Sequence, residues 1–394
     1  MDYNNAPTIP MSSPDLTDAE RQAVLSVVNT SALSMGPYIA AFEEAFRKHT
    51  GLRHAIGVNS GTAGLHLCVL ASGIQDGDLV ITTPFSFVAS SNVLLYERAI
   101  PVFVDVDART GNIDPAMVEQ AARQLTAGGS AARRWLPRRG AEKAGPLKAI
   151  LAVDVFGQMA DYDRLRETAR RHDLRLIEDA CESLGATYKQ RQAGTLGDTA
   201  VFAFYPNKQI TTGEGGMIVT DDDQAAERMR ALRNQGRAPG DTWLEHSYLG
   251  YNYRLDEMSA ALGVAQMQRL ESLLAARQQV ADWYNEMLAK IQDVEPPQLA
   301  PETTKASWFV YVIRLARGID RAAVTARLAQ KGIPVRPYFS PIHLHKYMTE
   351  RFGYRPGDYP ITEDLGARGL ALPFSGKMTQ AQVKTVCQAL SEAL

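Results

Sequence analysis

The sequence contains few cysteines, no excess of either charge and no long apolar run. Three cysteines in 394 residues, with no CxxC pair, exclude a disulfide framework and are typical of a reducing compartment. The 42 basic and 44 acidic side chains nearly cancel, which argues against nucleic acid or an anionic membrane as a partner. No apolar stretch approaches the length of a membrane span, and the first residues lack the basic and apolar regions of a signal peptide. We therefore expect a cytoplasmic protein that binds neither nucleic acid nor a membrane.

The length of the chain suits two domains. Up to residue 277, apolar strand-like runs alternate with helical patterns, which is typical of an α/β domain with a largely parallel sheet. The remainder predicts a smaller α+β domain, with strands at 308–315 and 335–339 and helices at 320–330 and 379–394. We therefore predict a large domain at 1–277 and a small domain at 278–394.

One segment departs in composition from its surroundings. Residues 126–147 are rich in glycine, alanine and arginine and show neither helical nor strand periodicity. Such a basic loop could touch a nucleotide diphosphate, but a solvated loop is the more common use of this composition. We predict a mobile surface insertion.

A single lysine, Lys208, stands in a polar, glycine-rich tip between two apolar runs at 200–205 and 217–220. This pattern predicts two strands joined by a loop. Pro206 precedes the lysine and three glycines follow it, so the loop is restrained and its backbone can approach a bulky group. Partial burial favours the neutral form of an amine, and a neutral amine can attack a carbonyl to form a Schiff base. A lysine drawn at random is usually a surface charge, but this context favours a reactive one.

Several predicted strands end in side chains or turns suited to a site. The strand at 55–58 runs through residues 59–64 into a helix, and a helix N-terminus after a glycine-containing turn is a good seat for phosphate. Gln158 ends the apolar run that begins at residue 149, and Asp179 ends the next run. Because the carboxyl ends of parallel strands meet at one edge of a sheet, we expect these groups to share a crevice.

The string Phe204-Tyr205-Pro206-Asn207-Lys208, followed by Thr211-Thr212-Gly213-Glu214-Gly215-Gly216, resembles the lysine loop of the DegT/DnrJ/EryC1/StrS family. Members of this family are sugar aminotransferases that use pyridoxal phosphate (PLP). The similarity extends from about Gly36 to about Leu372. It implies the aspartate-aminotransferase-like fold (fold type I), with a large mixed-sheet α/β domain and a smaller α+β C-terminal domain.

The resemblance also implies roles for individual residues. Lys208 would form the Schiff base, and Asp179 would keep the pyridine nitrogen of PLP protonated, because a nearby opposite charge stabilises a cation. The expected cofactor-binding residues are Lys208, Asp179, Gly61, Thr62 and Ala63 at the phosphate, Phe85 stacked on the ring, Gln158 and Glu182 beside the ring hydroxyl, and Asn252. The expected substrate-binding residues are Arg336, Tyr338 and His343. Asn252 would reach the phosphate of the other protomer's coenzyme, which implies a homodimer with shared active sites.

Two positions differ from the family pattern. Ala203 stands where many relatives carry a serine that helps to bind phosphate, and Asp154 stands where many have histidine. Neither change removes the core chemistry. His343 and His345 are two residues apart but have no cysteine or carboxylate neighbour in sequence, so we expect no metal site.

The resemblance implies transfer of an amino group, with L-glutamate as donor, to a nucleoside-diphosphate keto sugar. Such a reaction would serve amino-sugar biosynthesis for surface polysaccharide or natural-product glycosylation. A PLP-dependent sugar dehydratase, a cyclitol aminotransferase and a non-enzymatic regulator with the same fold are the alternatives. Dehydratases of this family with histidine at the lysine position cannot form the Schiff base, so Lys208 argues against that reading. Lys208 and Asp179 together argue against a regulator.

Overall fold

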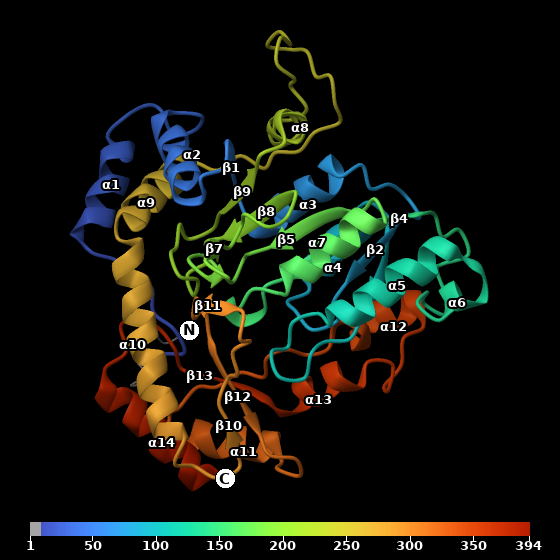
Figure 1. The fold of residues 1–394 in the computed structure, drawn as a ribbon. Helices are drawn as coiled ribbons and strands as arrows, with labels where there is room; N and C mark the ends of the chain where they lie inside the picture. Colours follow the sequence, from blue (N-terminus) through green and yellow to red (C-terminus); the bar gives the residue numbers. More distant parts are fainter. Residues whose placement is uncertain (1–8) are drawn as a thin grey trace.

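The computed structural model describes residues 9–394, and a mixed sheet forms the centre of its larger part (Figure 1). The sheet has seven strands in the order β1-β9-β8-β5-β4-β2-β3. Its strands are β1 (His54–Val58), β2 (Leu79–Thr82), β3 (Ile100–Phe103), β4 (Leu147–Val153), β5 (Arg175–Asp179), β8 (Thr199–Ala203) and β9 (Gly216–Thr220). The run from β3 to β8 is parallel, whereas β9 is antiparallel to both β8 and β1.

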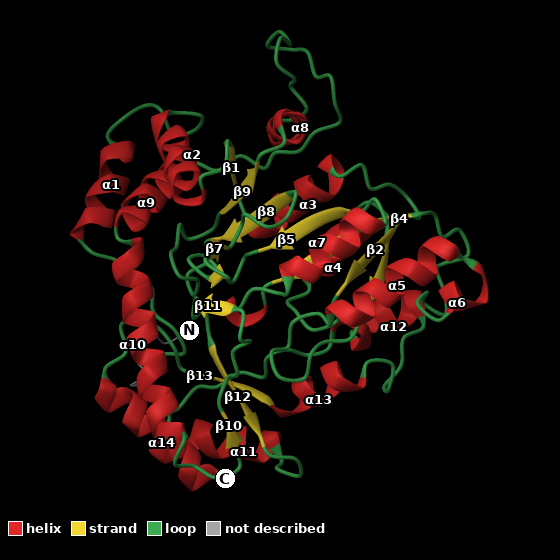
Figure 2. Ribbon diagram, viewed as in Figure 1, coloured by secondary structure: helices red, strands yellow, loops and turns green. Residues whose placement is uncertain are grey.

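Helices cover both faces of this sheet (Figure 2). The helices of the chain up to residue 233 are α1 (Asp18–Val28), α2 (Pro37–Thr50), α3 (Gly61–Ala71), α4 (Ala89–Tyr96), α5 (Pro115–Ala127), α6 (Gly129–Arg133), α7 (Tyr162–Arg171) and α8 (Asp223–Arg233). The sequence pattern Thr17-x-x-Glu20 forms a capping box at the start of α1, as such a pattern predicts. Local sequence signals therefore fix where several helices begin.

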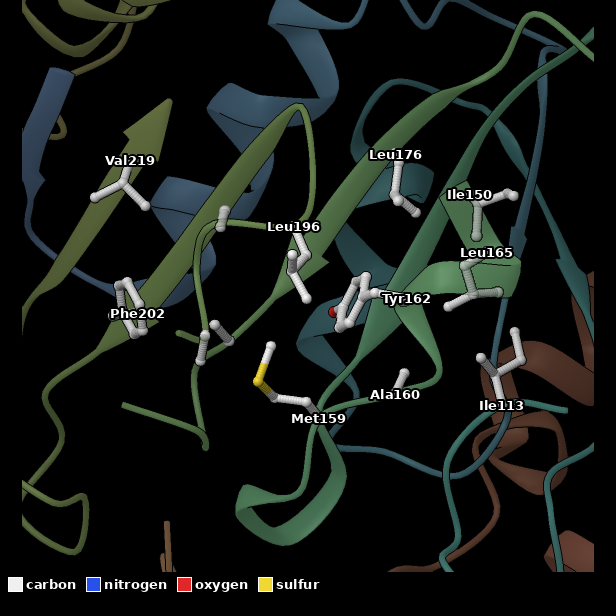
Figure 3. Close-up of a cluster of buried hydrophobic side chains, with 14 of the residues drawn as sticks. Ile113, Ile150, Met159, Ala160, Tyr162, Leu165, Leu176, Leu196, Phe202 and Val219 are labelled. Carbon is white, nitrogen blue, oxygen red and sulfur yellow. The ribbon is translucent and has the colours of Figure 1, made fainter. Parts of the chain in front are cut away.

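Alternate side chains of each strand fill two separate cores. In β4, Ile150 belongs to the core that includes α5 and α7, whereas Leu151 belongs to the core that includes α3 and α4. Figure 3 shows the first of these cores, with Tyr162 and Leu165 of α7 against the sheet. The same period of two sends the neighbouring carboxylates Glu178 and Asp179 of β5 to opposite faces. Asp179 is thereby placed on the face that carries α3.

The apolar residues that recur at helical spacing from Met258 to Leu274 predict one long helix. The structure instead has two, α9 (Glu257–Gln268) and α10 (Leu270–Leu288). Arg269 between them leaves the helical conformation, with φ −108° and ψ 6°, and its guanidinium donates to Glu20 and Asp15. α10 descends from α9 to the smaller part of the molecule (Figure 1). Leu274 still packs in the core of the large sheet, whereas Val280 packs in the core of the smaller part. The predicted domain boundary at residue 278 falls inside this helix and stays a prediction.

The smaller part is built on an antiparallel sheet of β10 (Val294–Glu295), β12 (Tyr311–Leu315) and β13 (Gly369–Leu372). Its helices are α11 (Arg321–Gln330) and α14 (Gln380–Ala393). A third sheet joins β11 (Thr303–Lys305) to β6 (Thr187–Tyr188) and β7 (Arg191–Gln192). It ties the segment that enters the smaller part to the large one. Within residues 9–394, no helix has the length and apolar character needed to cross a bilayer.

Between α11 and β13 the chain returns to the large part. This return contains η3 (Ile342–Leu344), α12 (Lys346–Phe352) and α13 (Pro360–Arg368), and Ile342 and Phe352 are buried in the core of the large sheet. The predicted strand at 335–339 is wrong: only Arg336 pairs, in an isolated bridge to Ala371. The reason is proline, since Pro334 and Pro337 on either side of Arg336 have no N–H to donate to a ladder.

The prediction of a mobile, unstructured insertion at 126–147 is also wrong. The segment contains the end of α5, the short helix α6 and the first residue of β4. Trp135 is 7% exposed, packs in the core of the large sheet and donates its indole N–H to Gln124 at 2.6 Å. Arg138 forms a forked ion pair with Asp358, with N–O distances of 2.5 and 2.7 Å. The segment lacks periodicity because a single tryptophan and a salt bridge, rather than a regular apolar face, anchor it.

Candidate active site

A cavity of about 660 Å³ lies at the carboxyl edge of the parallel strands. Its wall combines the N-terminus of α3, the end of β5, the loop between β8 and β9, and two segments from the C-terminal part of the chain. Its polar lining includes Ser60, Thr62, Ser86, Ser90, Asp179, Glu182, Asn207, Lys208, Glu214, Tyr338, Ser340 and His345. The turn before α3 and Asp179 at the end of β5 therefore meet at one crevice, as expected, whereas Gln158 does not line it.

Lys208 lies at the tip of the β8–β9 hairpin. The hairpin pairs Ala203 with Gly216, and the loop is closed by hydrogen bonds such as Lys208 N–H to the Tyr205 carbonyl at 2.8 Å. The Lys208 side chain is 13% exposed, and its Nζ lies 3.6 Å from Oε1 of Glu182. Nζ also lies 3.7 Å from the centre of the Phe309 ring. The amine is thus held between a carboxylate and an aromatic face, inside the cavity.

Asp179 forms part of the cavity wall and is 4% exposed. Ser90 of α4 donates its hydroxyl to Oδ2 at 2.7 Å, and the backbone N–H of Cys181 donates to Oδ1 at 3.2 Å. Both carboxylate oxygens are therefore oriented. Sequence reasoning missed Ser90, although its place in the first turn of the helix after the strand of residues 79–82 put it near the same sheet edge.

Glu182 contributes a second buried carboxylate. Its Oε2 accepts the backbone N–H of Phe156 at 2.9 Å. Burial raises the pKa of Glu182, and the neighbouring Lys208 ammonium opposes that rise. The Lys208–Glu182 contact therefore places an amine and a carboxylate at ion-pair distance where both side chains are largely removed from water.

The N-terminus of α3 forms the wall of the cavity at Gly61 and Thr62. Ser60 caps the helix, and its side chain accepts the N–H of Ala63 at 3.1 Å. Ala63 itself is 4% exposed and is not among the residues of the wall, and its expected role at a phosphate stays a prediction. A Cβ on Gly61 would lie 2.7 Å from the Cβ of Ala203, and one on Gly216 would lie 2.8 Å from Ser60. Glycine at both positions lets the helix end pack closely against the hairpin.

Phe85, expected to stack on the coenzyme, does not line the cavity. It is 2% exposed and packs edge-on against Phe156 and Phe339. Phe87, two residues later, is 62% exposed and lines the cavity. The loop between β2 and α4 turns Phe85 inward and Phe87 outward, a choice that the spacing alone does not reveal.

Gln158 also lies outside the cavity. Its side chain donates to the Gln298 carbonyl at 3.2 Å and accepts from Ala300 N–H and the Thr303 hydroxyl at 2.5 and 3.0 Å. It therefore fixes the segment before β11. Its predicted position beside a coenzyme hydroxyl stays a prediction, whereas Glu182 does line the cavity.

His343 is a core residue. It is fully buried, pairs with Glu363 at 3.0 Å and packs against Tyr359, and burial lowers its pKa. His345 lines the cavity in its place. Tyr338 lines the cavity as expected, whereas the exposed Arg336 is not among the residues of its wall.

Asn252 is exposed and does not line the cavity of its own chain. Its carbonyl accepts the side-chain amide of Asn59 at 3.3 Å, next to the turn that leads into α3. Within residues 9–394, no group of three or more His, Cys, Asp or Glu side chains is placed to hold a metal ion.

The residues present fit PLP. The cavity offers a restrained amine, a buried carboxylate with both oxygens oriented, an aromatic face at Phe87 and a helix N-terminus free of side-chain bulk at Gly61. These are the groups required for an aldehyde, a pyridine nitrogen, a planar ring and a phosphate.

Comparison with known proteins agrees with this geometry. The model of the DegT/DnrJ/EryC1/StrS aminotransferase family matches residues 14–391. A GDP-perosamine synthase from Caulobacter vibrioides is 39% identical over 395 residues, covering 99% of this chain and 100% of the relative. The solved structure of Helicobacter pylori PseC, an aminotransferase involved in the biosynthesis of pseudoaminic acid, superposes with a TM-score of 0.87 at 27% identity and covers 98% of each chain. S. venezuelae DesV, solved with a ketimine intermediate, gives 0.85 at 31% identity with the same coverage.

Fold and cavity define a fold type I enzyme that depends on PLP. The mixed sheet and smaller α+β part confirm the fold class predicted from the sequence. The chain belongs to the DegT/DnrJ/EryC1/StrS aminotransferase family and is a PLP-dependent aminotransferase.

Proposed function

We propose that this enzyme transfers the amino group of L-glutamate to the keto group of a sugar carried on a nucleoside diphosphate. The observation that carries the proposal is that Lys208, Asp179 and the N-terminus of α3 line one and the same cavity. The 39% identity to a GDP-perosamine synthase makes a GDP-linked keto sugar the first substrate to test.

The cavity residues divide into those that bind the coenzyme and those that move protons. The N-terminus of α3, at Gly61 and Thr62, would hold the phosphate, Asp179 the pyridine nitrogen, and Phe87 one face of the ring. When bound, PLP supplies an electron sink for the carbon that loses a proton.

Lys208 does the proton transfer in this proposal. Its Nζ takes the proton from Cα of the amino donor and, in the reverse half-reaction, returns a proton to the keto carbon of the acceptor. Glu182, 3.6 Å from Nζ, and the face of Phe309 hold this nitrogen in place between the two half-reactions. The low exposure of Lys208 limits competition from water.

A homodimer with shared sites is part of the proposal. Among the described residues 9–394, Lys208 and His345 are the only basic side chains in the wall of the cavity, which also carries Asp179, Glu182 and Glu214. A glutamate donor has two carboxylates and a nucleotide sugar has a diphosphate, so these anions need further cations or amides. A second copy of the chain would supply them.

The surface around the cavity supports such an interface. Trp243, Leu244 and Leu249 are 77%, 82% and 91% exposed, and the loop that contains them extends from the body of the molecule (Figure 1). Large apolar side chains that are this exposed are characteristic of a protein–protein contact surface. Asn252 follows the same loop and would act in the partner's site.

We place the reaction in the cytoplasm. The three cysteines Cys68, Cys181 and Cys387 are free, which suits a reducing compartment.

The reaction is tested with Lys208→Ala and a panel of GDP-, UDP- and dTDP-linked keto sugars, with glutamate as donor. The wild-type enzyme should aminate at least one sugar, and Lys208→Ala should lose the visible absorption band of the lysine-bound coenzyme. Release of a dehydrated sugar without consumption of glutamate would instead identify a dehydratase, and amination of a free cyclitol would identify that alternative.

The dimer is tested by sedimentation and by mixed dimers of Asn252→Ala with Lys208→Ala. A shared site predicts that one of the two sites in the mixed dimer lacks both residues and the other is intact. Low activity of the Asn252→Ala homodimer together with about half of wild-type activity in the mixed dimer supports sharing, whereas wild-type activity of the Asn252→Ala homodimer would show that Asn252 acts in neither site.

A further inference from the structure

Arg277, on α10, is a buried cation without an acidic partner. Its side chain is 4% exposed, and within residues 9–394 it forms no ion pair. Burial lowers its pKa to about 10. Burial of a charge costs folding free energy unless hydrogen bonds compensate for the lost water. The groups to which Arg277 donates therefore indicate what it stabilises.

The guanidinium of Arg277 joins two segments of the cavity wall. Nη2 donates to the carbonyls of Asn207 and Lys208 at 3.2 and 2.5 Å. Nη1 donates to the carbonyls of Trp308 and Phe309, both at 3.2 Å. One planar fork therefore fixes the backbone of the reactive lysine to the backbone of the aromatic residue on which its amine lies.

A second side chain completes this connection. Gln209, the residue after Lys208, donates its amide to the Glu182 carbonyl at 2.6 Å and to the Ser307 carbonyl at 3.1 Å. The two groups that contact Lys208 Nζ are Phe309 and Glu182. Each therefore belongs to a segment tied to the lysine loop, Phe309 through Arg277 and Glu182 through Gln209.

We infer that Arg277 is a positioning residue for the reaction. It fixes the backbone of residues 207–208 relative to that of residues 308–309, and so sets where Lys208 Nζ lies. Only arginine presents donors in a rigid plane that can reach four carbonyls, whereas a lysine ammonium at the same place reaches fewer. The inference rests on the proposed role of Lys208.

The test uses Arg277→Lys and Arg277→Gln in the full-length holoenzyme, with Arg314→Lys as matched control. Arg314 also donates to two backbone carbonyls, those of Ala108 and Arg109, but does not line the cavity. All variants are first checked for folding by thermal unfolding and circular dichroism. The readouts are the pH midpoint of the visible band of the lysine-bound coenzyme, the dissociation constant of PLP, and kcat and KM for glutamate.

Both Arg277 variants should shift the pH midpoint downward, because Phe309 and Glu182 both stabilise positive charge on the Lys208 nitrogen. They should also lower kcat by about ten- to hundredfold with a much smaller change in KM, since misplacement of a reacting group by about 1 Å has that effect. Arg314→Lys should leave the pH midpoint and kcat close to those of wild type.

An unchanged pH midpoint and kcat in folded Arg277→Lys would overturn the inference. So would failure of both Arg277 variants to fold while Arg314→Lys folds, because Arg277 would then serve the stability of the whole chain. Lys208→Ala separates this from a failure of the proposed function: if that variant retains the visible band, Lys208 is not the reactive amine.

Discussion

Replacement of Asp179 by asparagine removes one negative charge from the cavity and almost no volume. Asp179 is 4% exposed, so water cannot enter to solvate the groups that the carboxylate now contacts. The asparagine oxygen can still accept one of the two hydrogen bonds that Ser90 and Cys181 now donate. We therefore expect a cost in stability of about 1 kcal/mol or less.

The cost to catalysis should be larger. An opposite charge within a few ångströms shifts the pKa of its partner by about 1 to 3 units, and each unit corresponds to about 1.4 kcal/mol. If Asp179 keeps the pyridine nitrogen charged, its loss should raise the barrier by about 1.4 to 4 kcal/mol, which lowers kcat by about ten- to thousandfold.

The assay is the single-turnover half-reaction with glutamate at saturating PLP, together with urea unfolding. Asp105→Asn is the matched control. Asp105 is 3% exposed and accepts the N–H and hydroxyl of Thr362 at 2.9 and 2.7 Å, but it does not line the cavity. The control should lose stability and keep its rate. A rate for Asp179→Asn within about threefold of wild type would refute the reasoning.

Three further outcomes follow from the side-chain environments. Phe87→Ala should weaken PLP binding with little change in the unfolding temperature, whereas Phe85→Ala should cost about 3 to 5 kcal/mol of stability, as measured by PLP titration and urea unfolding. Trp135→Ala should also cost about 3 to 5 kcal/mol; no measurable loss would show that Trp135 does not anchor residues 126–147. Burial alone would raise the pKa of Glu20, but its hydrogen bonds to Thr17, Arg269 and Gln266 outweigh burial and lower it to about 2. Stability should therefore fall as the pH drops from about 4.5 to about 2.

The Glu20 prediction has its own check. Because the folded state holds this carboxylate ionised to a lower pH than the unfolded chain does, the stabilisation is complete above about pH 4.5. Glu20→Gln should reduce stability at neutral pH and flatten its decline in acid, as followed by urea unfolding across the pH range. An equally steep decline in that variant would assign the acid sensitivity to other carboxylates.

Much of the architecture was predictable because its signals lie close together in the sequence. The capping box at Thr17, the glycine-containing turn before α3 and the hairpin around Lys208 each depend on residues within a few positions of one another. Period-two alternation in β5 likewise places Asp179 on the face of α3. These features need no knowledge of distant partners.

The inward or outward direction of loop side chains was decided by distant packing. Phe85 rather than Phe87 turns inward because Phe156 and Phe339 offer it a partner surface, and His343 is buried because Glu363 and Tyr359 surround it. The role of Arg277 depends on the carbonyls of two segments that are remote in the sequence. Short-range patterns can specify where an element starts and which strand face a residue occupies, but a side chain in a loop has no periodicity to orient it, and its neighbours exist only once the chain has folded.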